Sequence, residues 1–272
     1  MTVYEIRDAA TDEKKLLGYL FYYEKSKRFF AELLSSIDEW SAPFIFSGLV
    51  KKGIYSIDSE WTMKFVRQRI IPSDRQNLGS ILKENRLFEY DEYRLLQISG
   101  GRCAQDELFL VKCNESDLAA EVCKRLEEKV RDVLPMGDKR VMVFFANGKA
   151  RVIDIGKMYG EDRRFANVLQ KPELFDNVMV SPGGNGIEWG EQRFISAGTL
   201  YNSGKRAPID YNTLLTFVQK RVMDTTETAA LLNCSRQYIG QLSAKGKLRP
   251  IKSGSNNSLF LAADIESESR SW

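Results

Sequence analysis

The 272-residue sequence contains no histidine. This absence removes the commonest general base and the commonest nitrogen ligand of zinc, and so argues against Ser-His-Asp, Cys-His and zinc-dependent hydrolysis. There are only four cysteines and no CxxC pair, a pattern typical of free thiols in a reducing compartment. No apolar run approaches the roughly 20 residues that a membrane span needs, and the first ten residues do not resemble a signal peptide. We therefore expect a cytoplasmic protein that is not an enzyme and has no catalytic residues, metal site, cofactor or membrane partner.

The most informative stretch is Asp224–Ile265, which has the signals of two short helices followed by a β-hairpin. Its first residue, an Asp, and Glu227 three positions later have the spacing of a capping box at a helix start. Ser235 is a good cap for a second helix over Arg236–Ala244. Two short apolar runs then flank the polar tip Gly254–Ser258, which has the composition of a wing.

The second of these helices has two different faces. Ile239 and Leu242 are three residues apart and are expected to pack inward together. The opposite side carries an Arg, two Gln and a Lys but no acid, and Arg and Gln are the side chains that pair with guanine and adenine edges. The alternative is an ordinary solvated helix face. The candidate DNA-binding residues on this helix and the wing are Ser235, Arg236, Gln237, Tyr238, Gln241, Lys245, Lys247, Arg249 and Lys252.

The same stretch resembles the DNA-binding head of MerR-type regulators and of related excisionase-like modules. The matching residues are Thr226–Leu232, Cys234–Ile239, Gly246–Ile251 and Ala263–Ile265. The resemblance implies a winged helix-turn-helix with base contacts from the second helix and phosphate contacts from the wing. Regulators of that family usually continue into a long dimerising helix, whereas this sequence stops at Trp272. We therefore expect dimerisation to come from the rest of the chain.

The charge distribution agrees with a nucleic-acid partner. Residues 205–254 contain nine Lys or Arg against three Asp or Glu, whereas the net charge of the whole chain is only +3. Phosphate binding requires such a concentrated positive field. Residues 1–204 are nearly neutral by comparison and are not expected to bind DNA through charge.

The N-terminal part combines strand signals with a polar block. Apolar and aromatic runs at Leu16–Tyr23 and Phe29–Leu34 predict a hairpin, Trp61–Ile71 fits a strand or a short helix, and Leu78–Glu84 fits a helix. The polar block supplies the candidate partner-binding residues Arg69, Arg75, Gln76, Asn77, Arg102, Gln105 and Asp106. The alternative is a buried Arg–Asp network that only fixes loops. The region resembles the N-terminal subdomain of HipA-type kinases, but it has none of the kinase core and implies no activity.

Two further helices are expected. The stripe formed by Leu118, Val122, Leu126, Val130 and Val133 predicts a helix over residues 114–134, which either faces the core or forms a two-fold dimer interface. A second helix is expected over residues 210–221, after a short basic linker. Its inner face would carry Leu214, Leu215 and Val218, and its last two residues, a Lys and an Arg, would lie within reach of phosphate.

Between these helices the sequence predicts a small α+β domain. Arg140–Phe145 and Lys149–Ile155 flank an Asn-Gly pair, the preferred two-residue hairpin turn. Residues 139–203 resemble a small α+β domain found in many bacterial proteins of unknown function, which implies a fold but no chemistry. The Gly-rich run at residues 181–186 lacks the Gly-Lys-Ser/Thr of a phosphate-binding loop, and we interpret it as a hairpin tip.

Together these patterns predict an α+β protein. It would have a mixed α/β region over residues 1–134, a small α+β domain over 139–203 and a winged helix-turn-helix over 209–272. The expected function is sequence-specific binding of double-stranded DNA by a homodimer, in a transcriptional regulator of bacterial or phage type. The alternative is an antitoxin-like or defence-related adaptor, whose N-terminal domains bind a protein and whose helix-turn-helix only autoregulates.

Overall fold

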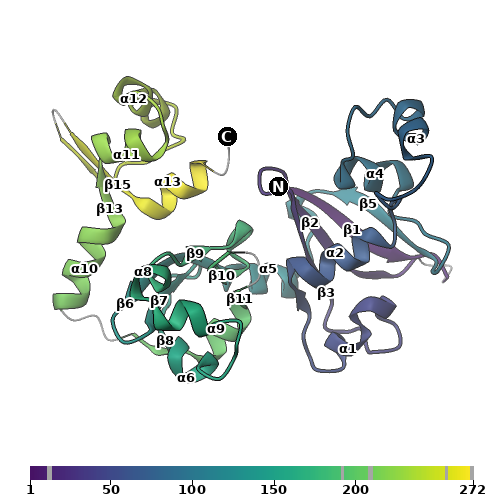
Figure 1. Ribbon diagram of the computed structural model, residues 1–272, viewed down its shortest axis with the longest axis horizontal. Coiled ribbons are helices and arrows are strands. Elements are labelled where there is room, and N and C mark those ends of the chain that lie inside the picture. The colour runs from purple at the N-terminus through teal and green to yellow at the C-terminus, as the bar shows by residue number, and fades with distance from the viewer. Residues whose placement is uncertain (11–13, 191–192, 208–210, 255–256, 270–272) are drawn as a thin grey trace. The chain divides into compact units, whose positions relative to one another are not determined.

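The computed structural model describes residues 1–10, 14–190, 193–207, 211–254 and 257–269. The chain divides into two compact units, Met1–Leu126 and Glu127–Trp272. Helices alternate with sheets in which every strand pair among the described residues is antiparallel, so the α+β prediction is confirmed (Figure 1).

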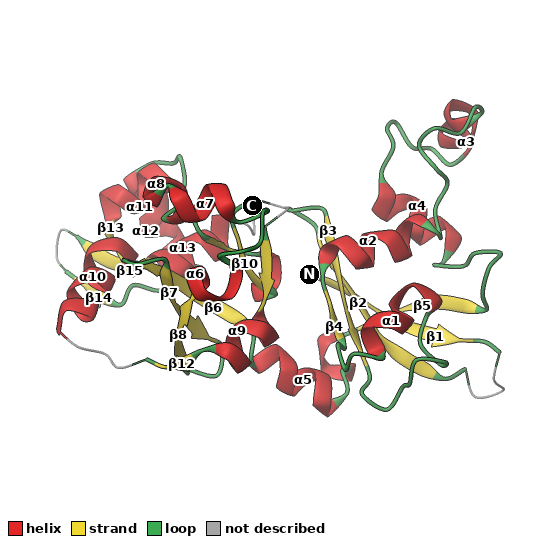
Figure 2. Cartoon of the chain, turned by 60° about the horizontal axis from the view of Figure 1, so that its bottom comes forward, coloured by secondary structure: helices red, strands yellow, loops and turns green. Residues whose placement is uncertain are grey.

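The N-terminal unit is built on a five-stranded sheet in the order β4-β3-β2-β1-β5 (Figure 2). Its strands are β1 (Thr2–Asp8), β2 (Leu16–Tyr23), β3 (Arg28–Leu33), β4 (Ser56–Ile57) and β5 (Leu108–Cys113). Strand β2 is apolar along its whole length because both faces of the sheet are covered. Leu20 and Tyr22 contribute to a large core on one face, and Tyr19 and Phe21 contribute to a smaller core on the other. The predicted β2–β3 hairpin is confirmed.

Helices cover both faces of this sheet. The helices of the unit are α1 (Ser47–Val50), α2 (Ser59–Arg67), α3 (Leu78–Glu84), α4 (Glu92–Ser99) and α5 (Ala120–Glu127), with short 3-10 turns at Phe44–Phe46 and Glu115–Asp117. The stretch that fitted either a strand or a helix is therefore helix α2, which Asp58 caps by accepting the Trp61 N–H at 2.9 Å. The helix predicted from Leu78 to Glu84 is confirmed as α3.

The long helix predicted over residues 114–134 is wrong in its second half. The helix α5 ends at Glu127, and Val130–Met136 forms strand β6, which pairs with β7 (Arg140–Phe145). Backbone pairing with β7 outweighs the helical spacing of the apolar residues, since β-branched valines are well suited to a strand. The remaining stripe, Leu118, Val122 and Leu126, packs against the sheet of its own unit, so it is not a free dimer surface.

The second unit begins with two sheets around one core. A four-stranded sheet has the order β12-β8-β7-β6, and a three-stranded sheet has the order β11-β10-β9. Their other strands are β8 (Ala150–Asp154), β9 (Met179–Val180), β10 (Gly186–Glu188), β11 (Phe194–Ser196) and β12 (Lys205–Arg206). The helices here are α6 (Ile155–Tyr159), α7 (Ala166–Gln170), α8 (Pro172–Phe175) and α9 (Ala197–Ser203). The predicted hairpin at Asn147-Gly148 is present, with Gly148 at a φ of 78°. The Gly-rich run, interpreted as a hairpin tip, connects the paired strands β9 and β10 through a 3-10 turn.

The last part of the chain follows the predicted order of two helices and a hairpin. It comprises α10 (Tyr211–Arg221), β13 (Val222–Asp224), α11 (Thr225–Leu231), α12 (Arg236–Ala244), β14 (Lys252–Ser253), β15 (Ser258–Leu261) and α13 (Ala262–Ser269). The three strands form a sheet in the order β13-β15-β14. We call residues 222–269 the head. Of the predicted wing tip, Ser255 and Asn256 lie outside the described residues, as do Pro208 of the linker and the helix cap expected at Asp210.

Candidate nucleic-acid interface

Helices α11 and α12 of the head each begin directly after the predicted cap residue, Asp224 and Ser235 respectively. The Asp224 carboxylate accepts the backbone N–H groups of Thr226 at 2.6 Å and Glu227 at 2.8 Å, and the Glu227 carboxylate accepts the Asp224 N–H at 2.8 Å. The hydrogen bonds that the Asp224 carboxylate accepts from the Glu227 N–H, the Asn257 side chain and the Thr226 N–H lower its pKa. The predicted capping box is therefore present, and it keeps a negative charge at the positive end of the helix dipole.

The wing is tied to the first helix of the head. Asn257, which lies in the second half of the wing tip, donates to Asp224 at 3.2 Å, and its side-chain oxygen accepts the Thr225 N–H at 3.1 Å. The Thr225 hydroxyl in turn accepts the Ser258 N–H at 3.1 Å. These bonds hold the start of β15 against the start of α11, so the base of the wing has a defined position in the head.

Helix α12 presents the predicted face to solvent. Ile239 and Leu242 are almost completely buried, in a core that also contains Leu248 and Phe260. On the opposite side Arg236, Gln237 and Gln241 are exposed. The inward pair anchors the helix, and three side chains suited to base edges project from the protein, as the sequence predicted.

Two of the predicted DNA-binding residues have structural roles. The Ser235 hydroxyl accepts the Tyr238 N–H at 3.2 Å and so caps α12. Tyr238 itself is half-buried and packs against the core of the head. Both residues shape the N-terminal turn of α12, and the exposed face depends mainly on Arg236, Gln237 and Gln241.

The predicted phosphate-binding residues follow α12 in the chain. Lys245 and Lys247 follow the end of α12, where Gly246 has a φ of 69°, and Lys252 lies on β14 of the wing. These three lysines and Arg249 are all exposed. The basic side chains therefore come from the turn after α12 and from the first half of the wing.

The two basic residues at the end of α10 do not belong to this surface. Arg221 makes ion pairs with Asp132 of β6 and with Glu266 of α13, the latter at 3.0 Å. Lys220 pairs with Asp176 at 3.1 Å. Both cations therefore form ion pairs with acids of their own unit, and their contact with phosphate stays a prediction.

The expected inner face of α10 is also wrong. Leu214, Leu215 and Val218 are exposed, whereas Phe217 makes an edge contact with Phe144 of β7, with ring centroids 5.3 Å apart. The apolar residues Leu214, Leu215 and Val218 lie on one side of α10, whereas the side that contains Phe217 packs against strands β6 and β7.

The seven candidate partner-binding residues divide into two groups. Arg69 is buried against the ring of Phe65 and forms an ion pair with Asp106. Burial lowers the pKa of Arg69, and Asp106 only partly offsets this effect. An internal Arg–Asp pair of the kind expected from a structural network is therefore present between Arg69 and Asp106.

The remaining members of that set are exposed. Arg102 and Gln105 line a shallow cavity of about 380 Å³ together with Asp106. Arg75, Gln76 and Asn77 lie on the loop before α3, where the Arg75 side chain donates to Asn77 at 3.0 Å. Among the contacts of the described residues none joins the loop before α3 to Arg102, Gln105 or Asp106, so the set does not form one site.

No protein-family model matches the chain, and no curated protein matches it. A similar solved structure is that of "Putative DNA Binding Protein NE0471" from Nitrosomonas europaea ATCC 19718, with 19% identical residues and a TM-score of 0.26. The match covers 45% of this chain and 79% of that chain. A TM-score this low supports no conclusion about fold or function.

None of the helices in the described part of the chain combines the length and apolar character that a membrane crossing requires.

Proposed function

We propose that the protein binds double-stranded DNA through the head and reads sequence with α12. The observation that carries this proposal is the exposed face of Arg236, Gln237 and Gln241, held outward by the burial of Ile239 and Leu242 on the other side. A helix of this kind fits the major groove, where Arg pairs with guanine and Gln with adenine. The surrounding Lys and Arg side chains would then contact phosphates on either side.

Gly240 supports the approach of α12 to DNA. A Cβ built on this residue meets nothing within 4 Å, so no atom of the protein itself requires a glycine there. A glycine inside a helix costs roughly 1 kcal/mol relative to alanine. A bare backbone in the middle of the exposed face would allow closer contact with the groove.

The Gly240→Ala variant provides a sharp test. We expect it to raise the free energy of unfolding by about 0.5–1 kcal/mol and to weaken specific DNA binding. Urea denaturation and electrophoretic mobility shift with a site selected from random duplexes would measure the two effects. A variant that is more stable and binds the selected site as tightly as the parent would show that Gly240 does not face the groove.

Base reading is tested separately from phosphate contact. Replacing Arg236 or Gln241 with Ala is expected to cost about 1–3 kcal/mol on the selected site and little on random DNA. Equal losses on both kinds of DNA would contradict base reading by α12. Failure to enrich any duplex sequence from a random pool would contradict sequence-specific binding altogether.

Phosphate contact is tested through salt dependence. Each of Lys245, Lys247, Arg249 and Lys252 is expected to contribute about one unit to the slope of log affinity against log salt. Lys220→Ala is the matched control, because this exposed lysine lies outside the head and pairs with Asp176. A slope that is unchanged in the quadruple variant would contradict the phosphate role of these residues.

We further propose that the DNA-binding form is a homodimer that acts in transcriptional regulation. One reading helix contacts only a few base pairs, and dimers usually gain specificity by reading two half-sites about one turn apart. Light scattering of the full chain, alone and on the selected duplex, tests this assembly. A chain that stays monomeric at micromolar concentration and also on DNA would contradict it.

The proposed role needs no catalytic residue, metal or cofactor, and we expect the protein to act in the cytoplasm, where its DNA target would lie. The adaptor alternative differs in what the N-terminal unit binds. It would be favoured if the selected DNA lay only in the protein's own promoter.

A further inference from the structure

Basic side chains gather at one edge of the second unit, where strand β12 pairs with β8 and helix α9 lies beside them (Figure 2). Arg206 of β12 is directly opposite Arg151 of β8 in this antiparallel pairing. Residues directly opposite each other share one face of a sheet and have Cβ atoms roughly 4.5–5.5 Å apart. Two arginine side chains therefore start from neighbouring positions on one face, an arrangement of like charges that is destabilising by itself.

Tyr201 of α9 brings a third cation to the same place. The Lys149 ammonium donates to the Tyr201 hydroxyl at 2.7 Å, and Asn147 Nδ2 donates to it at 3.2 Å. The Arg151 guanidinium lies 5.3 Å from the centroid of the Tyr201 ring. Because the hydroxyl oxygen accepts in both hydrogen bonds, its own proton can be donated to an incoming acceptor. We call Lys149, Arg151, Tyr201 and Arg206 the β8–β12 patch.

Among the described residues, no acid forms an ion pair with Lys149, Arg151 or Arg206. Two nearby acids have to be weighed against these three cations. Glu128 raises the pKa of Tyr201, but the hydrogen bond from Lys149 has the larger effect and the net shift is downward.

The other nearby acid is Asp154, at the end of β8. Side chains alternate between the two faces of a strand, so Asp154 lies on the face opposite to that of Arg151. It is directly opposite Arg140 of β7 in the pairing of the two strands. The face that carries the patch therefore has three cations against one acid, Glu128, and its net charge is positive.

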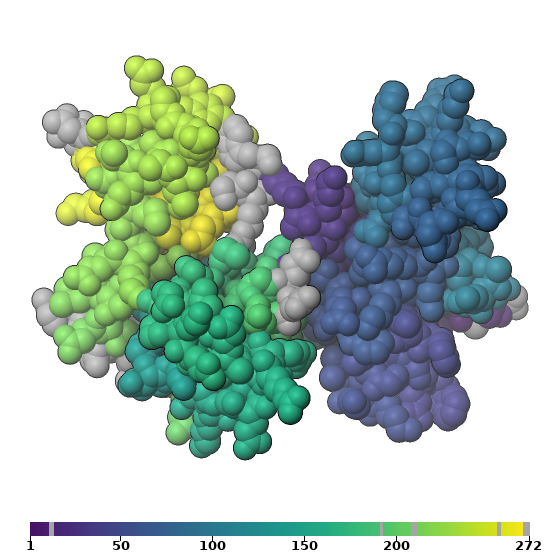
Figure 3. Space-filling view, in the orientation of Figure 1, coloured from purple at the N-terminus to yellow at the C-terminus, as the bar shows by residue number. Residues whose placement is uncertain are grey.

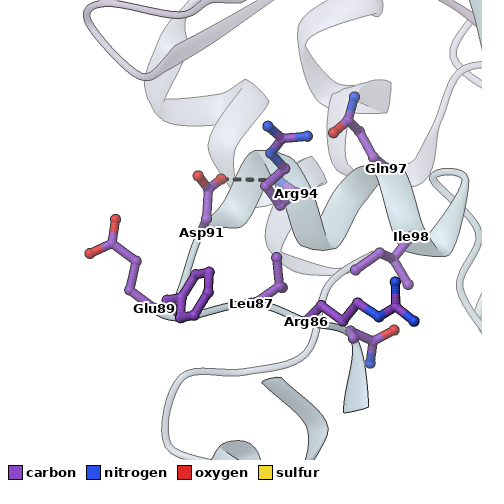
Figure 4. Close-up of a pocket in the computed structure, with 9 residues that line it drawn as sticks. Arg86, Leu87, Glu89, Asp91, Arg94, Gln97 and Ile98 are labelled. Carbon is purple, nitrogen blue, oxygen red and sulfur yellow. Dashed lines mark hydrogen bonds between the residues drawn. The ribbon is translucent and has the colours of Figure 1, made fainter. Parts of the chain in front are cut away.

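The charged surface of the N-terminal unit is different. A cavity of about 760 Å³ between α4 and the segment before it contains Arg86 and Arg94 but also Glu89 and Asp91 (Figure 4). The region of this segment forms part of the visible surface in Figure 3. Opposite charges in equal number favour no sign of partner there, whereas the β8–β12 patch is complementary to an anion.

The patch offers polar contacts without apolar ones. Of the large apolar side chains exposed in the described part of the chain, none lies on β8, α9 or β12. The core of a protein–protein interface is apolar and depleted in charge, and membrane binding needs buried apolar area as well as charge. Interfaces with DNA are more polar and much more positive, and half or more of their hydrogen bonds go to phosphate and sugar. The composition of the patch therefore fits a phosphate backbone best.

We propose that the β8–β12 patch binds the phosphate backbone of double-stranded DNA, as a second contact surface besides the head. Arg151 and Arg206 supply planar guanidinium groups that match phosphate oxygens, Lys149 supplies a point charge, and the Tyr201 hydroxyl supplies a further donor. The proposal rests on the proposed function in that the ligand is the same duplex, but the patch shares no residue with the head. Contacts of this kind hold the duplex without reading its sequence.

The test measures binding of the full chain to a fluorescent duplex of random sequence by anisotropy, between roughly 50 and 200 mM salt. Lys149→Gln, Arg151→Gln and Arg206→Gln together should lower the slope of log affinity against log salt by about 2–3 units, close to one for each lost phosphate contact. Lys205→Gln is the matched control, because this exposed cation is the neighbour of Arg206 on β12 but is opposite Val152, on the other face. It should change the slope by less than about half a unit.

Two single variants keep the test decisive if the triple variant does not fold by circular dichroism. Arg206→Gln removes one exposed cation from an edge strand and should lower the slope by about one unit. Tyr201→Phe keeps the ring and removes the hydroxyl, and it should weaken duplex binding about two- to fivefold. An unchanged slope in Arg206→Gln, or an equal loss in Lys205→Gln, would overturn the assignment of this face.

The outcomes separate the patch from base reading by the head. If a duplex sequence is enriched from a random pool and Arg236→Ala removes the preference, while the patch variants keep the parent slope, the head reads DNA and the proposal for the patch is wrong. If the patch variants lower the slope and no sequence is enriched, the patch binds the backbone and base reading by α12 is wrong. A parent chain that binds no duplex overturns both.

A lipid headgroup is the other source of phosphate, and vesicles that contain phosphatidylglycerol test it. We expect the patch variants to lose affinity for the duplex whatever they do on vesicles. Variants that lose vesicle binding but keep the duplex affinity and salt slope of the parent would assign the patch to a membrane surface and overturn the proposal.

Discussion

Removing one partner of the ion pair between Arg221 and Asp132 should strongly destabilise the second unit. The pair links the end of α10 to β6, and the Arg221 side chain also contacts Glu266 of α13 at 3.0 Å. The exposed fractions of the two side chains are only 14% and 7%. Removing one partner of such a pair leaves the other charge buried and uncompensated, which typically costs about 3–5 kcal/mol.

We therefore expect Arg221→Met to lower the free energy of unfolding by about 3 kcal/mol at neutral pH. Asp132→Asn should cost less, since Arg221 keeps its contact with Glu266. Replacing both residues by apolar ones of similar size, Met and Leu, should restore most of the loss. The matched control is Arg131→Gln, because Arg131 joins β6 to Asp264 of α13 through an exposed pair, and such pairs contribute about 0–1 kcal/mol.

The loss in Arg221→Met should also depend on pH. Burial raises the pKa of Asp132 even in the native protein, where Arg221 partly offsets the effect. Without Arg221 this pKa rises further, so the folded protein holds its proton to higher pH than the unfolded chain does. Stability should then fall as pH rises from the ordinary carboxyl range through the raised pKa. Urea denaturation of the parent and of Arg221→Met at pH 5 and pH 7.5, monitored by circular dichroism, measures this loss of stability. A loss below about 1 kcal/mol at neutral pH, or no greater loss at pH 7.5 than at pH 5, would refute the reasoning.

Three other predictions follow from local geometry. Ser235→Ala removes the cap of α12 and should lower the free energy of unfolding by about 1 kcal/mol in urea denaturation; an unchanged value would mean that the cap is replaced. Gly18→Ala places a Cβ 2.5 Å from a backbone oxygen of β3 and should destabilise the N-terminal unit by at least about 1–3 kcal/mol, whereas Gly79→Ala, with nothing within 4 Å, should not. Burial raises the pKa of Cys113 to about 11, so at pH 8 its alkylation by iodoacetamide should be about 100-fold slower than that of a thiol with the ordinary pKa of 9.0. Mass spectrometry of the labelled peptides measures this rate, with the exposed Cys123 as the reference thiol. Equal rates for the two thiols would contradict the slow alkylation of Cys113.

The local structure of the head was predictable from the sequence because its determinants are close together in the chain. The capping box at Asp224 and the cap at Ser235 act within one helical turn, and Ile239 and Leu242 define the inner face of α12 by their spacing alone. The same holds for strand β2, whose unbroken apolar run matches the structure from end to end. In each case neighbouring residues supply the hydrogen bonds or the face pattern that decides the conformation.

What only the tertiary structure decided depends on partners far away in the chain. Val130 and Val133 have helical spacing, yet they form a strand because β7 is available to pair with them. Arg221 forms an ion pair with Asp132, which lies 89 residues earlier, and no local pattern indicates this partner. Long-range pairing and burial outweigh local preference at these positions, and a single sequence does not contain the identity of the partner.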